Sequence, residues 1–104
     1  MQVYISKRVH QAIEEFYDIA LQRHPALDEK TVVKKMQRLY DAMESLSDFA
    51  YIYPLARYKS EWIKKGYKEF ICEDFHFAFN IAENEYGEEF VLIEDACHSL
   101  LYHN

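Results

Sequence analysis

Three side chains near the C-terminal end could carry out proton transfer: His98, Tyr102 and His103. An imidazole changes its charge near neutral pH and a phenol can donate a proton, so these residue types are typical of general acid and base catalysis. A plainer interpretation also fits, in which His98 is an ordinary residue at the end of a strand and the other two belong to a C-terminal tail. We prefer the plainer interpretation and assign no catalytic role from these residues alone.

The same region raises the question of a metal site. Cys97 and His98 with His103, or His76 beside Cys97, would supply nitrogen and sulfur ligands. Structural zinc needs four convergent ligands, which usually occur in pairs at short spacing. The sequence lacks such pairs, and we predict no metal site and no cofactor.

Positive charge is concentrated between residues 57 and 68, where five cations stand against one acid. The candidate binding residues are these cations and the tryptophan among them: Arg57, Lys59, Trp62, Lys64, Lys65 and Lys68. Such a segment could attract an acidic protein segment or a nucleic acid by electrostatic steering. It could equally be a solvated loop, and Trp62 could be either an interface hot spot or a core anchor. Both pairs of interpretations stay open.

The remaining charge is acidic. Residues 1–56 have a net charge of -1, and residues 69–104 hold nine acidic side chains with no Lys or Arg, so the chain carries -6 overall. Proteins that bind nucleic acid draw affinity from cations spread over one face, because these release counterions from the phosphates. This sequence offers one local basic patch, and direct nucleic-acid binding is therefore disfavoured.

The elements that must position these residues follow from composition and periodicity. With 104 residues, 50% hydrophobic content and two glycines, the chain is predicted to form a single domain over residues 1–104. A β-prone run at residues 3–5 precedes a first helix that Ser6 could cap, that covers residues 9–21 and that Pro25 ends. A second helix begins near Asp28 and has an apolar stripe from Val32 to Ala50. One helical turn follows at residues 60–63, between the second helix and the strands.

The last third of the chain has the alternation of β-strands. Residues 67–72 and 75–82 follow a period of two on either side of a turn at Glu73-Asp74. After a polar connection at residues 84–88, the apolar run at residues 90–93 supplies the last strand. The predicted order is β-α-α-β-β-β, an α+β fold in which a helical hairpin packs on a small antiparallel sheet. In this sheet Cys72 and Cys97 are about 9 to 10 Å apart, so both thiols should be free. The predicted core residues are Tyr4, Phe16, Leu39, Phe77, Phe79 and Leu92.

The expected location is the cytoplasm. The N-terminal residues lack the apolar run of a secretory signal, and no stretch approaches the length of a membrane span. Two cysteines without a signal are more often free thiols of a reducing compartment. We therefore expect no membrane association.

The order of elements, with several short motifs, resembles the RelE/ParE toxin superfamily of bacterial type II toxin–antitoxin modules, often called plasmid stabilisation proteins. The resemblance covers nearly the whole chain and rests on the runs at residues 3–6, 9–21, 46–49, 53–54, 77–81 and 90–93. Position by position, it implies that Lys68 is the basic residue at the start of the second strand. It also implies that His98 is the histidine that follows the last strand.

The resemblance implies two modes of action, both neutralised by an antitoxin protein. ParE-like members act by binding DNA gyrase, and RelE-like members cleave mRNA on the ribosome. Cleavage needs positive charge where the phosphate becomes more anionic, whereas the later strands here offer acids: Glu73, Asp74, Glu94 and Asp95.

The charge pattern therefore favours protein binding over an enzyme. In this mode a disordered antitoxin segment wraps the helices and the sheet edge. Two alternatives stay open: a ribosome-dependent endoribonuclease, and a diverged, non-toxic binding or adaptor domain.

Overall fold

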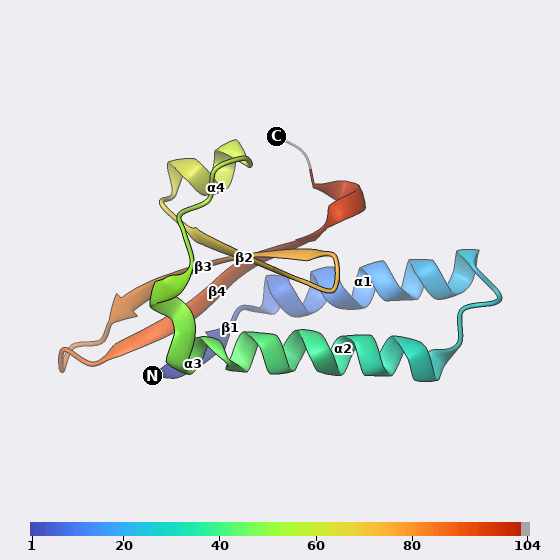
Figure 1. Ribbon diagram of the computed structural model, residues 1–104, viewed down its shortest axis with the longest axis horizontal. Coiled ribbons are helices and arrows are strands. Elements are labelled where there is room, and N and C mark those ends of the chain that lie inside the picture. The colour runs from blue at the N-terminus through green and yellow to red at the C-terminus, as the bar shows by residue number, and fades with distance from the viewer. Residues whose placement is uncertain (103–104) are drawn as a thin grey trace.

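The computed structural model, which describes residues 1–102, is an α+β domain with two long helices on one face of a four-stranded sheet (Figure 1). The helices are α1 (Lys7–Arg23) and α2 (Glu29–Glu44), which run antiparallel below the sheet in Figure 1. Shorter segments follow: α3 (Leu46–Phe49), η1 (Ala50–Ile52) and α4 (Ser60–Lys64). The strands are β1 (Gln2–Ile5), β2 (Lys68–Cys72), β3 (Phe75–Glu83) and β4 (Glu89–His98), and η2 (Ser99–Leu101) comes last. No helix among residues 1–102 is long and apolar enough to cross a membrane.

The sheet has the order β1-β4-β3-β2 and is mixed, not purely antiparallel as the sequence suggested. Strands β2, β3 and β4 form the predicted antiparallel meander. Strand β1, however, pairs parallel with β4, with Val3 opposite Val91. A parallel pair requires a long crossover, and here the helices and the β2–β3 hairpin provide it. The prediction missed this pairing because it left β1 without a partner.

The two helices begin where local chemistry favours it. Ser6 and Asp28 are the extended residues that precede α1 and α2. The Asp28 carboxylate accepts a hydrogen bond of 2.7 Å from the backbone N–H of Thr31, and this bond lowers the pKa of Asp28. The Ser6 side chain makes no such capping bond, but α1 begins directly after Ser6 and α2 directly after Asp28, as predicted.

Strand β4 is longer than predicted and contains a bulge. Ala78 lies opposite Asp95 and Phe79 lies opposite Ile93, so Glu94 is the extra residue. Because β4 continues to His98, Glu94 and Asp95 belong to the strand and do not follow it. The bulge shifts the alternation by one residue, so that Ile93 packs toward the helices whereas Asp95 lies with Ala78 on the side of α4, where it is 9% exposed.

Hydrophobic side chains fill both faces of the sheet. The larger cluster lies between the sheet and the helices, and Leu39, Phe77 and Phe79 are fully buried there, as predicted. On the opposite face Ala56, Trp62 and Ala78 form a smaller cluster under α4. Strand β3 thus contributes to both clusters, since successive side chains point to opposite faces.

Three of the predicted core residues are less buried than expected. Tyr4 is 53% exposed, so its assignment to the core was wrong. It alternates with Val3 and Ile5, which pack toward the helices, and its ring lies edge-on to Phe90 at 5.5 Å between centroids. Phe16 and Leu92 are half-buried. The prediction that both cysteines are free is confirmed.

Candidate functional site

Trp62 is a core residue. It is fully buried beneath α4, and its indole Nε1 donates a hydrogen bond of 3.0 Å to Asp95 Oδ2. The interface hot-spot interpretation is therefore wrong, and the core-anchor interpretation is confirmed. The reason lies in the fold: α4 packs on the face of the sheet opposite the long helices (Figure 1). Of its two large apolar side chains, Trp62 is buried against the sheet and Ile63 is 46% exposed.

Asp95 joins three elements through its carboxylate. Besides Trp62, it accepts a hydrogen bond of 3.0 Å from Arg8 Nε on α1 and one of 2.9 Å from the backbone N–H of Ala96. The hydrogen bond and the attraction to Asp95 raise the pKa of Arg8. This buried carboxylate is therefore compensated by its partners, and it has a structural role that sequence reasoning missed.

Two of the basic residues are occupied by intramolecular contacts. Lys68 is half-buried, and its Nζ donates a hydrogen bond of 2.6 Å to the backbone oxygen of Tyr53. Lys65 Nζ, directly after α4, lies 3.4 Å from Glu61 Oε1 in the preceding turn. Lys68 therefore holds the segment before α4 against β2, and its charge is not directed to a partner.

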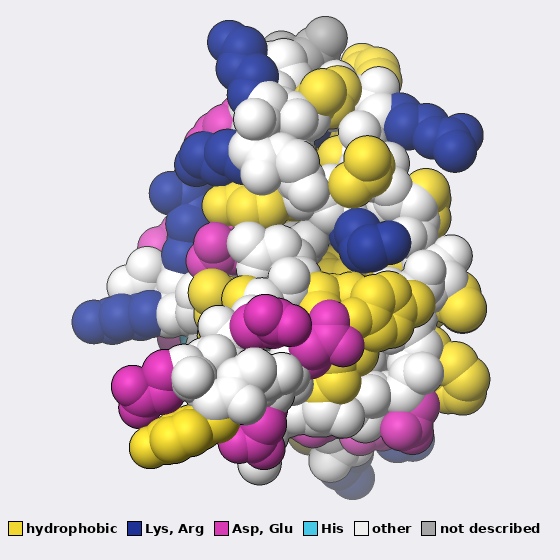
Figure 2. Space-filling view, turned by 90° about the vertical axis from the view of Figure 1, so that its left-hand side faces the viewer, with side chains coloured by type: hydrophobic (Ala, Val, Ile, Leu, Met, Phe, Trp, Pro, Cys, Tyr) yellow, Lys and Arg dark blue, Asp and Glu magenta, His cyan; other side chains and the backbone are white. Residues whose placement is uncertain are grey.

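The other basic residues do not converge on one point. Lys59 Nζ lies over the Trp62 ring, 5.8 Å from its centroid, whereas Lys64 is exposed on α4. Arg57 lies before α4 and lines a pocket. Figure 2 shows one side of the molecule, with cationic side chains mainly in its upper half and acidic ones mainly in its lower half. The predicted basic residues are therefore dispersed over α4, the preceding loop and the start of β2, and Arg57 lines the pocket described below.

A second group of chemically active residues lies on the face of the sheet that carries α4. Glu69 on β2 accepts hydrogen bonds of 3.0 and 3.1 Å from the Tyr102 hydroxyl, and its Oε2 lies 2.9 Å from Nδ1 of His76 on β3. The rings of His76 and Tyr102 are stacked at 3.7 Å between centroids. Burial, followed by the hydrogen bond to Glu69, raises the pKa of Tyr102 to about 12. Tyr102 therefore remains protonated and donates to Glu69 at physiological pH.

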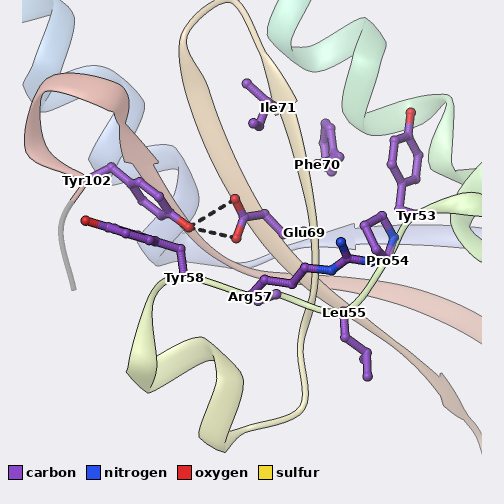
Figure 3. Close-up of a pocket in the computed structure, with 10 residues that line it drawn as sticks. Tyr53, Pro54, Leu55, Arg57, Tyr58, Glu69, Phe70, Ile71 and Tyr102 are labelled. Carbon is purple, nitrogen blue, oxygen red and sulfur yellow. Dashed lines mark hydrogen bonds between the residues drawn. The ribbon is translucent and has the colours of Figure 1, made fainter.

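Glu69 and Tyr102 of this group line a pocket of about 330 Å³ at the β2 edge of the sheet (Figure 3). Glu69 and Tyr102 lie on one side, joined by the hydrogen bonds drawn in Figure 3, and Tyr58 lies next to Tyr102 with 5.2 Å between ring centroids. The rest of the lining is mostly apolar or aromatic: Tyr53, Pro54, Leu55, Ala56, Phe70 and Ile71. Arg57 supplies the one cationic side chain of this lining. The pocket thus suits a protein segment better than a polyanion.

His98 is not part of this group. It lies opposite Phe75 in the sheet register and stacks on Phe16 of α1 at 3.8 Å between centroids, so it faces the helices. Its Nδ1 accepts a hydrogen bond of 3.1 Å from the backbone N–H of Leu100. Burial lowers the pKa of His98 below its ordinary value. The structure therefore separates His98 from Tyr102 by the thickness of the sheet, and His103 lies outside the described residues.

The pairing of Glu69 with His76 was accessible from the sequence. A two-residue turn at Glu73-Asp74 pairs Cys72 with Phe75 and, continuing outward, Glu69 with Ala78. Glu69 and His76 are then diagonal neighbours on one face, within reach of long side chains. The packing of Tyr102 on them had no signal in the sequence, because it depends on how η2 turns after β4.

Groups of three or more His, Cys, Asp or Glu that could hold a metal ion do not occur within residues 1–102. Comparison of the chain with protein-family models, curated proteins and solved structures finds no match. The resemblance to the RelE/ParE superfamily therefore remains a prediction from the motifs and the order of elements.

Proposed function

We propose that this chain is the toxin-like component of a bacterial type II toxin–antitoxin module, that it works in the cytoplasm, and that it acts by binding proteins. An antitoxin would neutralise it. A target of the ParE type, DNA gyrase, is part of this proposal and derives from the family resemblance alone.

Exposed apolar side chains around the β2 edge are the observation that carries the proposal. Leu55 and Ile71 are each 61% exposed and Tyr58 is 54% exposed, and all three line the pocket. We call this set, with the pocket between them, the β2-edge surface. Further exposed apolar residues precede it in the chain: Phe49, Tyr51 and Ile52. Contiguous apolar surface of this kind is typical of protein interaction sites.

The position of β2 adds a backbone component to this surface. Strand β2 is at the edge of the sheet, and the loop before α4 covers only its first residues, through the bond from Glu69 N to Pro54 O and the bridge of Leu55 with Lys68. The outer edge of the rest of β2 can accept an added strand from a partner, whose side chains would then enter the pocket. This geometry matches the binding of an extended protein segment.

Charge at the pocket disfavours nucleic-acid cleavage as the main activity. A phosphate in the pocket would lie near the Glu69 carboxylate, whose side chain is only 14% exposed. Both carboxylate oxygens already accept hydrogen bonds from Tyr102. The contact between Glu69 and Tyr102 therefore anchors the segment after β4 on the sheet.

One observation favours the alternative, a ribosome-dependent endoribonuclease. Glu69, His76 and Tyr102 combine a carboxylate, an imidazole and a phenol next to a pocket that Arg57 also lines. A carboxylate can accept a proton from a ribose hydroxyl, and an arginine can stabilise a phosphate in the transition state. If the protein were a nuclease, Arg57→Ala would lower mRNA cleavage by about a hundredfold or more.

Inducible expression in a bacterial host tests the proposal, with growth, mRNA integrity and plasmid supercoiling scored in the same cultures. We expect growth arrest with intact mRNA and altered supercoiling. Arrest with cleaved mRNA would establish the endoribonuclease instead. Normal growth would point to a diverged, non-toxic binding or adaptor domain.

Surface variants then locate the binding site. Leu55→Asp and Ile71→Asp place a charge on exposed positions of the β2-edge surface, and each should relieve the arrest without changing the far-UV circular dichroism spectrum. Tyr86→Asp is the matched control, because Tyr86 is 79% exposed on the β3–β4 turn and should not affect the arrest. Arrest that persists in both surface variants would exclude the β2 edge from the mechanism.

A further inference from the structure

An apolar groove lies away from the β2 edge, between the outer face of α1 and η2. It has a volume of about 450 Å³, and Phe16, Ile19 and Ala20 of α1 line one side. Leu100 and Leu101 of η2 line the other side. Ile19, Leu100 and Leu101 are 49%, 79% and 58% exposed, so the groove presents apolar surface to solvent. Exposed apolar surface that is concentrated in this way is typical of an interaction site.

Charged residues at the two ends of the groove identify that partner. Glu15 and Arg23 line the groove together with Ile19, and all three are exposed. Each is four residues from the next, so the order along one stripe of α1 is acid, isoleucine, base. At 1.5 Å per residue, Glu15 and Arg23 are about 12 Å apart along the helix axis. This pattern is its own complement when it is turned by 180° about Ile19.

We propose that the groove binds a second copy of this chain, with the two α1 helices antiparallel about a two-fold axis at Ile19. In that arrangement Glu15 of each copy faces Arg23 of the other, and the two isoleucines meet at the centre. A two-fold contact is isologous, which means that one surface must be complementary to itself. The stripe on α1 meets this requirement.

The side chains around the stripe are suited to the same contact. Ala20 is small, and it allows a second helix to approach the backbone of α1. Leu100 and Leu101 project beside the groove and would cover the flanks of the helix from the other copy. The apolar centre with a charged rim is the usual composition of a protein interface.

The mass of the full chain in solution, measured by light scattering over a concentration series, tests the proposal. We expect the mass to rise to twice the 12.5 kDa of one chain as concentration increases. Ile19→Asp should keep the protein at the mass of one chain, with an unchanged circular dichroism spectrum. A wild-type protein that stays at the mass of one chain throughout would overturn the proposal.

Charge reversal tests the antiparallel geometry directly. Glu15→Arg and Arg23→Glu each place like charges opposite one another at both ends of the interface, and each should weaken self-association by about tenfold or more. Mixing the two variants should restore dimers, now with one copy of each, because every facing pair is again of opposite sign. Glu14→Arg is the control: it makes the same change one residue away, on the part of α1 that faces α2, and should leave the dimer intact. Dimers that ignore both reversals, or a mixture that does not recover, would refute the two-fold arrangement.

Discussion

Asp95 shows how differently two charged contacts of one carboxylate contribute to stability. The Arg8 side chain is 70% exposed, and an ion pair of this kind is worth about 0–1 kcal/mol because water screens it. The bond from Trp62 is fully buried, and removal of Asp95 would leave the indole N–H without its acceptor. An unsatisfied buried donor costs about 1–3 kcal/mol. The hydrogen bond of Asp95 with Trp62 therefore contributes more to stability than its ion pair with Arg8.

We accordingly predict that Asp95→Ala lowers the free energy of unfolding by about 1–3 kcal/mol and that Arg8→Ala lowers it by at most about 1 kcal/mol. Urea denaturation followed by Trp62 fluorescence measures both. Asp95→Asn keeps an acceptor for the indole and should lie between them. Equal losses for Arg8→Ala and Asp95→Ala would contradict the assignment.

His98 should make stability depend on pH. Burial between Phe16 and Phe75 lowers its pKa, with a smaller opposing effect of Asp74, so the unfolded chain binds a proton more readily than the folded one. The free energy of unfolding should therefore decrease as the pH falls below the ordinary value of 6.5, and His98 should contribute no such dependence well above that value.

Thermal unfolding of the wild type and of His98→Asn, measured across this pH range, tests the assignment. Asparagine retains an acceptor for the N–H of Leu100 but does not titrate. The wild type should lose more stability than the variant on acidification, whatever their difference at high pH. Parallel curves for the two proteins would show that His98 does not titrate as proposed.

At the scale of single residues, the sequence predicted where cations and aromatic residues are concentrated, but it did not predict which side chains they contact. The concentration of cations from Arg57 to Lys68 is real, yet only the fold shows that Lys68 donates inward to Tyr53. Trp62 could not be assigned, because tryptophan is highly buried on average in folded proteins and is also enriched at interface hot spots. Burial depends on which face α4 covers, and no local pattern encodes that choice.

At the scale of elements, the turn between β2 and β3 occurs where it was predicted, but its two residues adopt a backbone conformation that side chains disfavour. Glu73 and Asp74 have φ values of +49° and +66°, which corresponds to the left-handed pair of a type I′ turn. Most residues other than glycine are destabilised in this conformation, by roughly 1–2 kcal/mol for a typical side chain and by less for asparagine and aspartate, whose short side chains can bond locally. Glu73 is compensated by ion pairs with Lys35 and Arg38 of α2, at 3.7 and 3.4 Å.

Asp74→Gly should therefore raise the free energy of unfolding by about 1 kcal/mol, because it relieves the left-handed backbone and leaves the backbone oxygen that accepts from Ser99 in place. Gly87→Ala in the β3–β4 turn is the opposite change. An added Cβ there meets no atom within 4 Å, so its cost of about 1 kcal/mol would be conformational alone. Chemical denaturation of both variants should show shifts of opposite sign, and shifts of the same sign would disprove the explanation.

The elements themselves followed from periodicity wherever the pattern was long. Helix α1, the start of α2 and the β2–β3 turn occur where they were expected, because 3.6-residue and two-residue periods are distinct over such lengths. The second helix is shorter than its apolar stripe indicated, since the stripe up to Ala50 is divided among α2, α3 and η1. The prediction ended β4 at residue 93, where the apolar run is followed by Glu94 and Asp95. A bulge with a buried carboxylate breaks the alternation there, and only the partner side chains from α1 and α4 make that acceptable.

At the scale of the whole molecule, the sheet separates two hydrophobic clusters that share one strand. Phe77 and Phe79 face the long helices, whereas Ala78 between them faces Trp62. The β4 residue opposite Ala78, Asp95, ties α4 and α1 together through its two side-chain partners. Neither cluster can lose its packing without loosening β3 and β4. The two faces should therefore unfold together, although the chain is elongated, with extents of 49 × 27 × 22 Å.

One variant can test whether the two faces of the sheet unfold together. Far-UV circular dichroism reports mainly on the long helices, and Trp62 fluorescence reports on the opposite face, so their urea transitions should coincide. Leu39→Ala removes fully buried side-chain volume from the helix side and should lower the free energy of unfolding by about 2–5 kcal/mol in both signals equally. If α4 were a separate unit, Leu39→Ala would shift the dichroism transition alone. Coincident shifts would instead show that the helices, the sheet and the segment bearing the β2-edge surface form one cooperative structure, which can hold that surface in place for a partner.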